Sequence, residues 1–328
     1  MAETLVTHAP NPPATLRGRG PARDVLLPRR ARAYSVPWVL RPEDRRRSLQ
    51  EGIEQRIANL NRRVYPMAPG RWLRRRLERQ LSFPSVPIAM HRVCTRLDGL
   101  RIAFLSDIHA GTFMEESDLC RIFERVASEE PDLVCIGGDL VSRHAEEILR
   151  LRKPLGLLRA PLGVFAVPGN HEYHAERDLR LCRQVLEESG VPLLVNAGRR
   201  VVRGGASLWV AGVDDATEGR PDLSRALRGS REEEPVVLLS HNPDLFDVAS
   251  AAGVDLTLAG HTHGGQIAPL GRALRPTRRG YWAGHFESRH AQLYVGRGVG
   301  VSLLPLRIGA PAEVPILRLT RAAPHLLR

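Results

Sequence analysis

The sequence predicts an α/β protein with mixed sheets, and two patterns along the chain support this. Between residues 101 and 189, short apolar runs of strand length alternate with longer amphipathic stretches, which is typical of strand–helix–strand units. Apolar runs at 191–195, 200–203 and 207–213 then follow one another without a helix between them, so we expect antiparallel or mixed pairing there. At 328 residues, the chain can form one large domain or two small ones.

Five of the predicted strands end in polar residues that suit metal binding or catalysis. These strands are 101–106, 132–136, 163–167, 236–239 and 254–258. The residues that follow them are, in chain order, Asp107 and His109, Asp139, Asn170 with His171 and Glu172, His241, and His261 with His263. Sites in α/β sheets form at the carboxyl ends of strands, so we expect these residues to lie together.

Each polar group has an ordinary explanation when it is taken alone. A His-x-His pair is often a surface or core feature, and Asp139 is placed to cap a helix over 141–152. In an extended segment, alternation puts both side chains of an Asp-x-His or His-x-His pair on one side. Together the groups supply carboxylate, imidazole and amide ligands with no thiolate, and a carboxylate can bridge two cations. The sequence therefore predicts a two-metal site for hard or borderline ions.

In order and spacing, the five groups resemble the motif blocks of the calcineurin-like metallophosphoesterase superfamily, over about residues 100–300. The sequence Gly-His-Thr-His-Gly-Gly-Gln at 260–266 and the later segments 294–301 and 307–311 resemble a bacterial branch that includes YkuE-like and YaeI-like phosphodiesterases. The resemblance implies a four-layer αββα sandwich of two mixed sheets. Some members of that branch act on UDP-2,3-diacylglucosamine, which makes a lipid- or nucleotide-linked phosphate the expected substrate class.

The resemblance also implies a role for each site residue. One metal is expected at Asp107, His109 and His263, and the other at Asn170, His241 and His261, with Asp139 bridging both. In such a site a hydroxide between the metals would attack phosphorus, and His171 would act as general acid at the leaving oxygen or as a positive contact to the phosphate. This is the chemistry of a metal-dependent phosphodiesterase or pyrophosphatase. We expect manganese in both positions, with iron, zinc or nickel as alternatives. The alternative function is a non-catalytic metal-binding scaffold that its N-terminal helices recruit to a membrane or a partner. It is disfavoured because no ligand of the family is missing.

The positive charge of the chain lies in its N-terminal part. Residues 1–100 contain 20 arginines and 8 acidic residues, whereas basic and acidic residues balance over the remainder, so this part carries the whole net charge of +12. Residues 1–40 are rich in proline and arginine and predict a disordered tail. Residues 44–64 and 70–83 have the spacing of basic amphipathic helices. We expect residues 1–84 to form this basic extension and residues 85–328 the catalytic domain.

The basic extension has two interpretations. Its helices either pack on the catalytic domain with solvated arginine faces, or residues 44–83 bind an anionic membrane surface. Nucleic-acid binding is not expected, because aromatic residues for base stacking are nearly absent there. Farther along, the segment 264–289 carries several arginines and Trp282, and we interpret it as either a cap over the site or a solvated loop.

The expected compartment follows from the cysteines and from the lack of targeting signals. The four cysteines have no CxxC spacing, which favours free thiols in a reducing environment. Neither a signal peptide nor a run of about 20 apolar residues is visible in the sequence. We therefore expect a cytoplasmic phosphoesterase, attached peripherally to the inner face of the membrane if the basic extension binds lipid.

Overall fold

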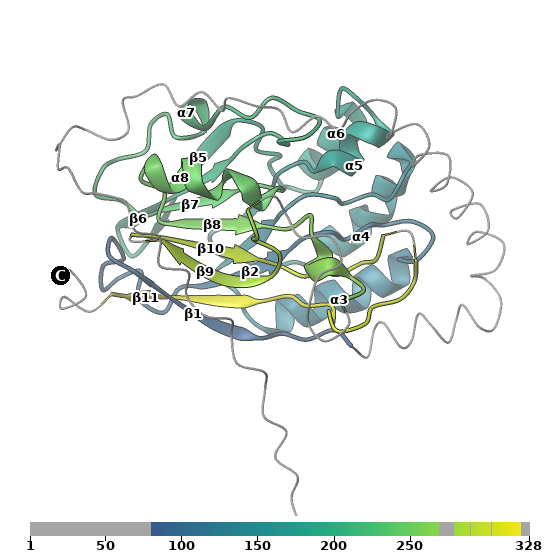
Figure 1. The fold of residues 1–328 in the computed structure, drawn as a ribbon, viewed down its shortest axis with the longest axis horizontal. Helices are drawn as coiled ribbons and strands as arrows, with labels where there is room; N and C mark the ends of the chain where they lie inside the picture. Colours follow the sequence, from purple (N-terminus) through teal and green to yellow (C-terminus); the bar gives the residue numbers. More distant parts are fainter. Residues whose placement is uncertain (1–79, 269–278, 289, 303, 323–328) are drawn as a thin grey trace, which may run out of the picture.

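The computed structural model describes residues 80–268, 279–288, 290–302 and 304–322. Their strands form two β-sheets that pack face to face (Figure 1). Among the described residues, no helix has the length and apolar character needed to cross a membrane.

The first sheet has five strands in the order β1-β11-β2-β3-β4. They are β1 (Ser85–Met90), β2 (Arg101–Leu105), β3 (Leu133–Ile136), β4 (Val164–Ala166) and β11 (Ile316–Arg321). Strands β2, β3 and β4 are parallel, and β1 is parallel to β11, whereas β11 is antiparallel to β2. The sheet is therefore mixed, as the sequence predicts.

The second sheet has six strands in the order β5-β6-β7-β8-β10-β9. They are β5 (Ala197–Arg203), β6 (Ala206–Gly212), β7 (Val236–Leu239), β8 (Leu256–Ala259), β9 (Gly284–Ser288) and β10 (Ala291–Val295). The four central strands are parallel, and the two edge strands, β5 and β9, pair antiparallel with their neighbours.

Alternation along β2 shows how the layers are stacked. Ile102 and Phe104 pack into the core between the two sheets, whereas Ala103 and Leu105 pack toward the helices that cover the first sheet. The covering helices of the first sheet are α3 (Glu116–Ser128), η2 (Ala145–Leu151), α4 (Arg152–Leu155), α5 (Asn170–Ala175) and α6 (Arg180–Glu188). The second sheet is covered by α7 (Leu223–Ala226), η3 (Pro243–Leu245) and α8 (Phe246–Ala251). The predicted four-layer αββα arrangement is confirmed.

Two local expectations are wrong. The helix predicted over 141–152 is instead the 3-10 helix η2 followed by α4, and His144 occupies its N-cap position in place of Asp139. The backbone N–H groups of Leu140 and Val141 donate to the side chain of Glu172, which keeps this stretch out of a helix. The run at 191–195 forms one isolated bridge to β4 in place of a strand.

The predicted helices of the N-terminal extension fall almost entirely outside the described residues. The prediction over 70–83 is testable only at its end, where Ser82 forms an isolated parallel bridge with Glu313 and is not helical. The Ser82 backbone N–H donates to the Ala312 carbonyl, which ties the entry of the chain to the segment before β11. The domain division after residue 84 stays a prediction.

Candidate metal centre

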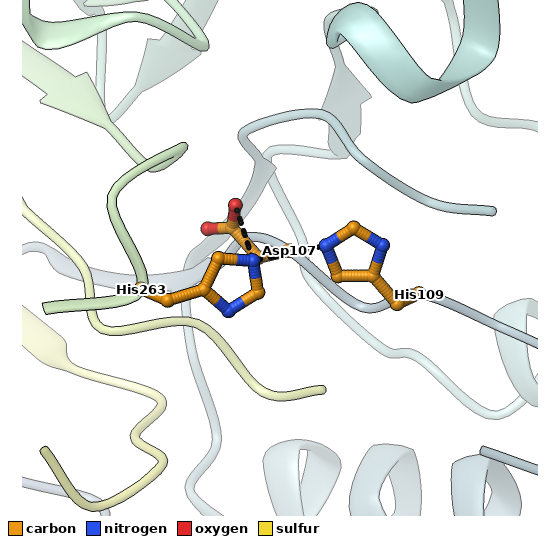
Figure 2. Close-up of side chains that lie close together, drawn as sticks. All are labelled: Asp107, His109 and His263. Atoms are coloured by element: carbon orange, nitrogen blue, oxygen red, sulfur yellow. Dashed lines mark hydrogen bonds and ion pairs between the residues drawn. The ribbon is translucent and has the colours of Figure 1, made fainter. Parts of the chain in front are cut away.

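The first cluster of predicted ligands joins Asp107, His109 and His263 at the ends of β2 and β8 (Figure 2). The Nε2 atoms of the two histidines are 3.0 Å apart, and His263 Nε2 is 3.5 Å from Asp107 Oδ1. All three side chains are buried. In Figure 2 the rings of His109 and His263 face each other, with the Asp107 carboxylate beside His263.

Asp139 lies between this cluster and the remaining predicted ligands. Its Oδ2 atom is 3.7 Å from His109 Nε2 and 3.3 Å from His241 Nε2. His171 Nε2 is 4.0 Å from the same oxygen, and the His171 backbone N–H donates to Asp139 Oδ1. One carboxylate therefore faces both groups of histidines, as a bridging ligand must.

The second cluster joins Asn170, His241 and His261. His261 Nδ1 is 3.1 Å from Asn170 Oδ1 and 3.3 Å from His241 Nε2. On its other side, His241 Nδ1 is 2.8 Å from the Gly137 carbonyl, which accepts the ring proton and leaves Nε2 free to act as a ligand. The structure thus brings all seven predicted ligands and His171 together, while their roles stay predictions.

The backbone at the site is strained in a way that the sequence pattern did not predict. Five of the nine non-glycine residues with positive φ in the described chain are predicted ligands: Asp107, His109, Asp139, His261 and His263, with φ between 49° and 71°. Left-handed backbone is unfavourable for such side chains, and it persists where a functional site requires it. The expected extended geometry of the pairs is therefore wrong. Each pair follows the end of its strand, and His261 and His263 face different clusters.

Burial keeps three of the imidazoles neutral. It lowers the pKa of His109 to about 3 and that of His261 to about 4. The pKa of His263 also lies well below its usual range, first because of burial and then because of the nearby His109. A neutral imidazole has the free nitrogen lone pair that a metal ion requires.

The two carboxylates at the centre have different environments. Burial alone would raise the pKa of Asp139, but the positive charges of His241 and His171 outweigh it and hold this pKa well below its usual range. At Asp107 burial outweighs the opposing charge of His241, and the pKa of this carboxyl is raised to about 6.

Two observations show that the cluster fits bound cations. Asp107 Oδ2 is buried and has no hydrogen-bond partner among the described residues. The surrounding backbone also comes too close for side chains: a Cβ atom at Gly260 would lie 2.5 Å from this oxygen, and one at Gly138 would lie 2.8 Å from His241 Nδ1. Oxygen and imidazole donors packed this tightly, without thiolates, suit manganese, iron, zinc or nickel.

Glu172 organises the site although it is not itself a predicted ligand. Its buried carboxylate accepts hydrogen bonds from the backbone N–H groups of Gly169 and of residues 139–141. It thereby joins the loop that carries Asp139 to the helix start that carries Asn170. The sequence signal was the carboxylate in Asn170-His171-Glu172, whose partners could not be read from the chain.

Arg307 supports the first cluster from behind. It is buried, and its guanidinium donates to the backbone carbonyls of Arg297, Gly300 and Ala310, among others. Its Nη2 atom also lies 3.3 Å from His263 Nδ1. Sequence reasoning included Arg307 in a motif of the resemblance but assigned it no role, because its partners come from distant parts of the chain.

Comparison with known proteins identifies the family to which this arrangement belongs. A family model described as calcineurin-like phosphoesterase matches residues 100–265, which include every predicted ligand. The chain belongs to the calcineurin-like phosphoesterase family. Members of this family are metal-dependent phosphoester hydrolases, so the family prediction made from the motif blocks is confirmed.

Curated relatives extend the similarity beyond this domain model. An uncharacterized metallophosphoesterase of Helicobacter pylori is 34% identical over 226 residues, covering 67% of this chain and 60% of that protein. The transmembrane protein with metallophosphoesterase domain of Bos taurus is 34% identical over 259 residues, covering 73% and 57%. The uncharacterized metallophosphoesterase YkuE of Bacillus subtilis is 29% identical over 234 residues, covering 68% and 79%. The chain thus spans about three fifths of the first two relatives.

Proposed function

We propose that this chain is a metal-dependent phosphodiesterase or pyrophosphatase that hydrolyses a lipid- or nucleotide-linked phosphate. The observation that carries the proposal is the position of Asp139 Oδ2, which lies within 4 Å of histidine nitrogens from both clusters. A non-catalytic scaffold is less well supported, because the ligand set is complete and His171 lies beside it.

Asp107, His109 and His263 would hold one divalent cation, and Asn170, His241 and His261 the other, with Asp139 between them. We favour manganese, with iron, zinc or nickel as alternatives, because the donors are oxygen and imidazole nitrogen. When bound, two cations neutralise the phosphate oxygens and lower the pKa of a water molecule that serves as nucleophile.

His171 would protonate the leaving oxygen. Its side chain is partly exposed, unlike those of the buried ligands His109 and His241, so it can meet a substrate. His171 Nδ1 lies 2.5 Å from the Ser142 carbonyl, which only accepts hydrogen bonds, so the Nδ1 proton is held there. Nε2, which faces Asp139, is then the atom that exchanges a proton with the substrate.

Substitution of the bridging residue tests the proposal directly. We expect Asp139→Asn and His261→Ala each to abolish hydrolysis of bis-p-nitrophenyl phosphate with manganese present, because each removes a ligand. Substitution of the exposed Arg183, which lies outside the clusters, provides the matched control and should leave turnover unchanged. Near-normal turnover by either ligand variant would contradict the proposed function.

The substrate class is supported by the relatives and by the N-terminal extension. The bovine relative is named a transmembrane protein, and a UDP-2,3-diacylglucosamine-like substrate would place a phosphate at a membrane surface. Ser82 forms an isolated bridge with Glu313, whose carboxylate accepts a hydrogen bond from the Arg297 backbone N–H near the first cluster. A panel of UDP-diacylglucosamine, cyclic nucleotides and glycerophosphodiesters would separate the substrate classes.

Attachment to an anionic membrane through residues 44–83 is the corresponding proposal for the partner. We expect the full-length protein to sediment with phosphatidylglycerol vesicles, and a variant with Arg74, Arg75 and Arg76 changed to glutamine to sediment several-fold less, since each arginine near the surface contributes about 1 kcal/mol. Neutral phosphatidylcholine vesicles are the control. Equal sedimentation of both proteins with anionic vesicles would refute this role of the arginines.

A further inference from the structure

Asp215 is a completely buried carboxylate that the proposed mechanism does not use. It lies just beyond the end of β6, which runs parallel to β7 with Gly212 opposite Leu239. The Val213 backbone N–H also donates to the Leu239 carbonyl, so the chain after β6 continues alongside the segment that leads to His241. Asp215 therefore lies in the segment next to the one that carries His241.

The two oxygens of Asp215 have different surroundings. Oδ1 accepts hydrogen bonds from the Thr217 backbone N–H, the Thr217 hydroxyl and the Glu218 backbone N–H, at 2.9, 2.5 and 2.8 Å. These bonds explain the local turn, and the amide oxygen of an asparagine would accept them equally well. Oδ2 is buried and has no hydrogen-bond partner among the described residues. The turn does not require this second oxygen or the negative charge.

The second cluster is short of negative charge. Its own members Asn170, His241 and His261 are neutral when they act as ligands, and the two carboxylates near His241, Asp139 and Asp107, are both shared with the first cluster. A divalent cation buried among neutral donors gains less electrostatic stabilisation than one beside a carboxylate.

The turn that holds Asp215 also contacts the helix that carries Asn170. The hydroxyl of Tyr173, three residues after Asn170 in α5, donates to Asp214 Oδ1, and the Asp215 backbone N–H donates to the same oxygen. The turn is therefore attached to two of the elements that carry ligands of the second cluster, the segment after β7 and α5.

We propose that Asp215 is a positioning residue of the second metal site: its buried carboxylate, with one oxygen unpaired, supplies the negative charge that the ligands Asn170, His241 and His261 lack. The proposal rests on the metal assignment of the proposed function. It concerns the affinity for the cation and adds no step to the reaction.

The test is calorimetric titration of metal-free, full-length protein with Mn²⁺, comparing wild type with Asp215→Asn. Asparagine keeps the turn and removes only the charge. We expect one of the two Mn²⁺ equivalents to bind about 10-fold more weakly, the size typical for groups that support metal ligands, and the other to be unchanged. The melting temperature of the metal-free protein should stay the same. Electron paramagnetic resonance at two equivalents should show less of the spin-coupled Mn²⁺ pair.

Asp214→Asn is the matched control. Asp214 precedes Asp215 in the same turn, but both of its oxygens are paired, with the Tyr173 hydroxyl and the Asp215 N–H on one and the Arg220 N–H on the other. We expect this variant to change Mn²⁺ affinity less than Asp215→Asn does. An equal loss in both variants would show a general effect of charge in the turn and would overturn the specific role of Asp215.

The remaining outcomes separate this inference from the proposed function. Unchanged binding of both Mn²⁺ equivalents by Asp215→Asn overturns the inference while leaving the proposed function intact. Weakening of both equivalents together with a lower melting temperature shows a purely structural role and also overturns it. Selective weakening in a protein that hydrolyses no phosphodiester supports the inference and contradicts the proposed function.

Discussion

Asp107 and Glu234 are both buried carboxylates, but they differ in hydrogen bonding and in the direction of their pKa shifts. Glu234 accepts two hydrogen bonds from the Arg200 guanidinium, one from the Ser207 hydroxyl and one from the Arg231 N–H. Burial alone would raise its pKa, yet these partners lower it to about 2. Asp107 accepts the His261 N–H on one oxygen, has no partner on the other, and has its pKa raised to about 6 by burial.

The ionised Glu234 stabilises the folded state, whereas the ionised Asp107 destabilises the metal-free folded state. At Glu234 every bond formed on folding favours the ionised carboxylate, so the group stabilises the packing of β5 and β6. At Asp107 the ionised carboxylate is unfavourable until a cation arrives, and left-handed backbone adds to this cost. Of these two buried carboxylates, the incompletely paired one belongs to the metal centre and the completely paired one to the scaffold.

The largest expected effect is that of Asp107→Asn on activity. Removing this ligand should lower phosphodiester hydrolysis by more than about 100-fold, because loss of a mere supporting partner of a metal ligand already costs 10- to 100-fold. The metal-free variant should be as stable as the metal-free wild type, or more so, because asparagine needs no buried charge. Activity assays and urea unfolding in the presence of EDTA measure the two quantities. A clear loss of metal-free stability would break the comparison.

Glu234→Gln should show the reverse pattern, with a smaller effect. We expect the free energy of unfolding at pH 7 to fall by about 1–2 kcal/mol, since the change weakens the hydrogen bonds of a buried carboxylate with the partly exposed Arg200. Hydrolysis by the folded variant should stay near the wild-type rate, because Glu234 contacts no member of either cluster. Urea unfolding and steady-state assays test this. An activity loss larger than the fraction unfolded would contradict it.

The smallest effect, and the most diagnostic, is the pH dependence of that stability difference. A glutamate whose pKa is lower in the folded than in the unfolded state stabilises the protein above the unfolded value, near 4.5, and loses this contribution as the pH falls toward about 2. The difference between wild type and Glu234→Gln should therefore be constant above pH 5 and shrink below it. A difference that stays constant down to pH 3 would mean that packing, and not charge, is lost.

Much of the fold and of the site composition could be predicted from the sequence, because both follow from local patterns. Buried runs such as Leu133–Ile136 are strands, and polar residues at their carboxyl ends meet at one edge. The spacing of Asp107, His109, Asp139 and the later histidines was sufficient to indicate the family. These features need only the period of a strand and the rule that sites form where parallel strands end.

The remaining features depend on contacts between distant segments. Glu172 accepts hydrogen bonds from the backbone N–H groups of residues 139–141, which keeps the start of the helix predicted over 141–152 out of a helical conformation. The left-handed backbone of His261 and His263 turns their rings toward different clusters, against the alternation expected of an extended segment. Arg307 supports His263 across 44 positions of sequence. The spacing of residues along a single sequence does not indicate which distant residues will contact one another.

The loops that carry the predicted ligands come from both sheets. Asp107, Asp139 and Asn170 follow strands of the first sheet, whereas His241 and His261 follow strands of the second. The strands of each sheet are joined to one another by backbone hydrogen bonds. Cations bound by loops of both sheets would therefore cross-link the two sheets at one edge of the sandwich. Metal binding would then increase the resistance of the two sheets to separation, in addition to enabling hydrolysis.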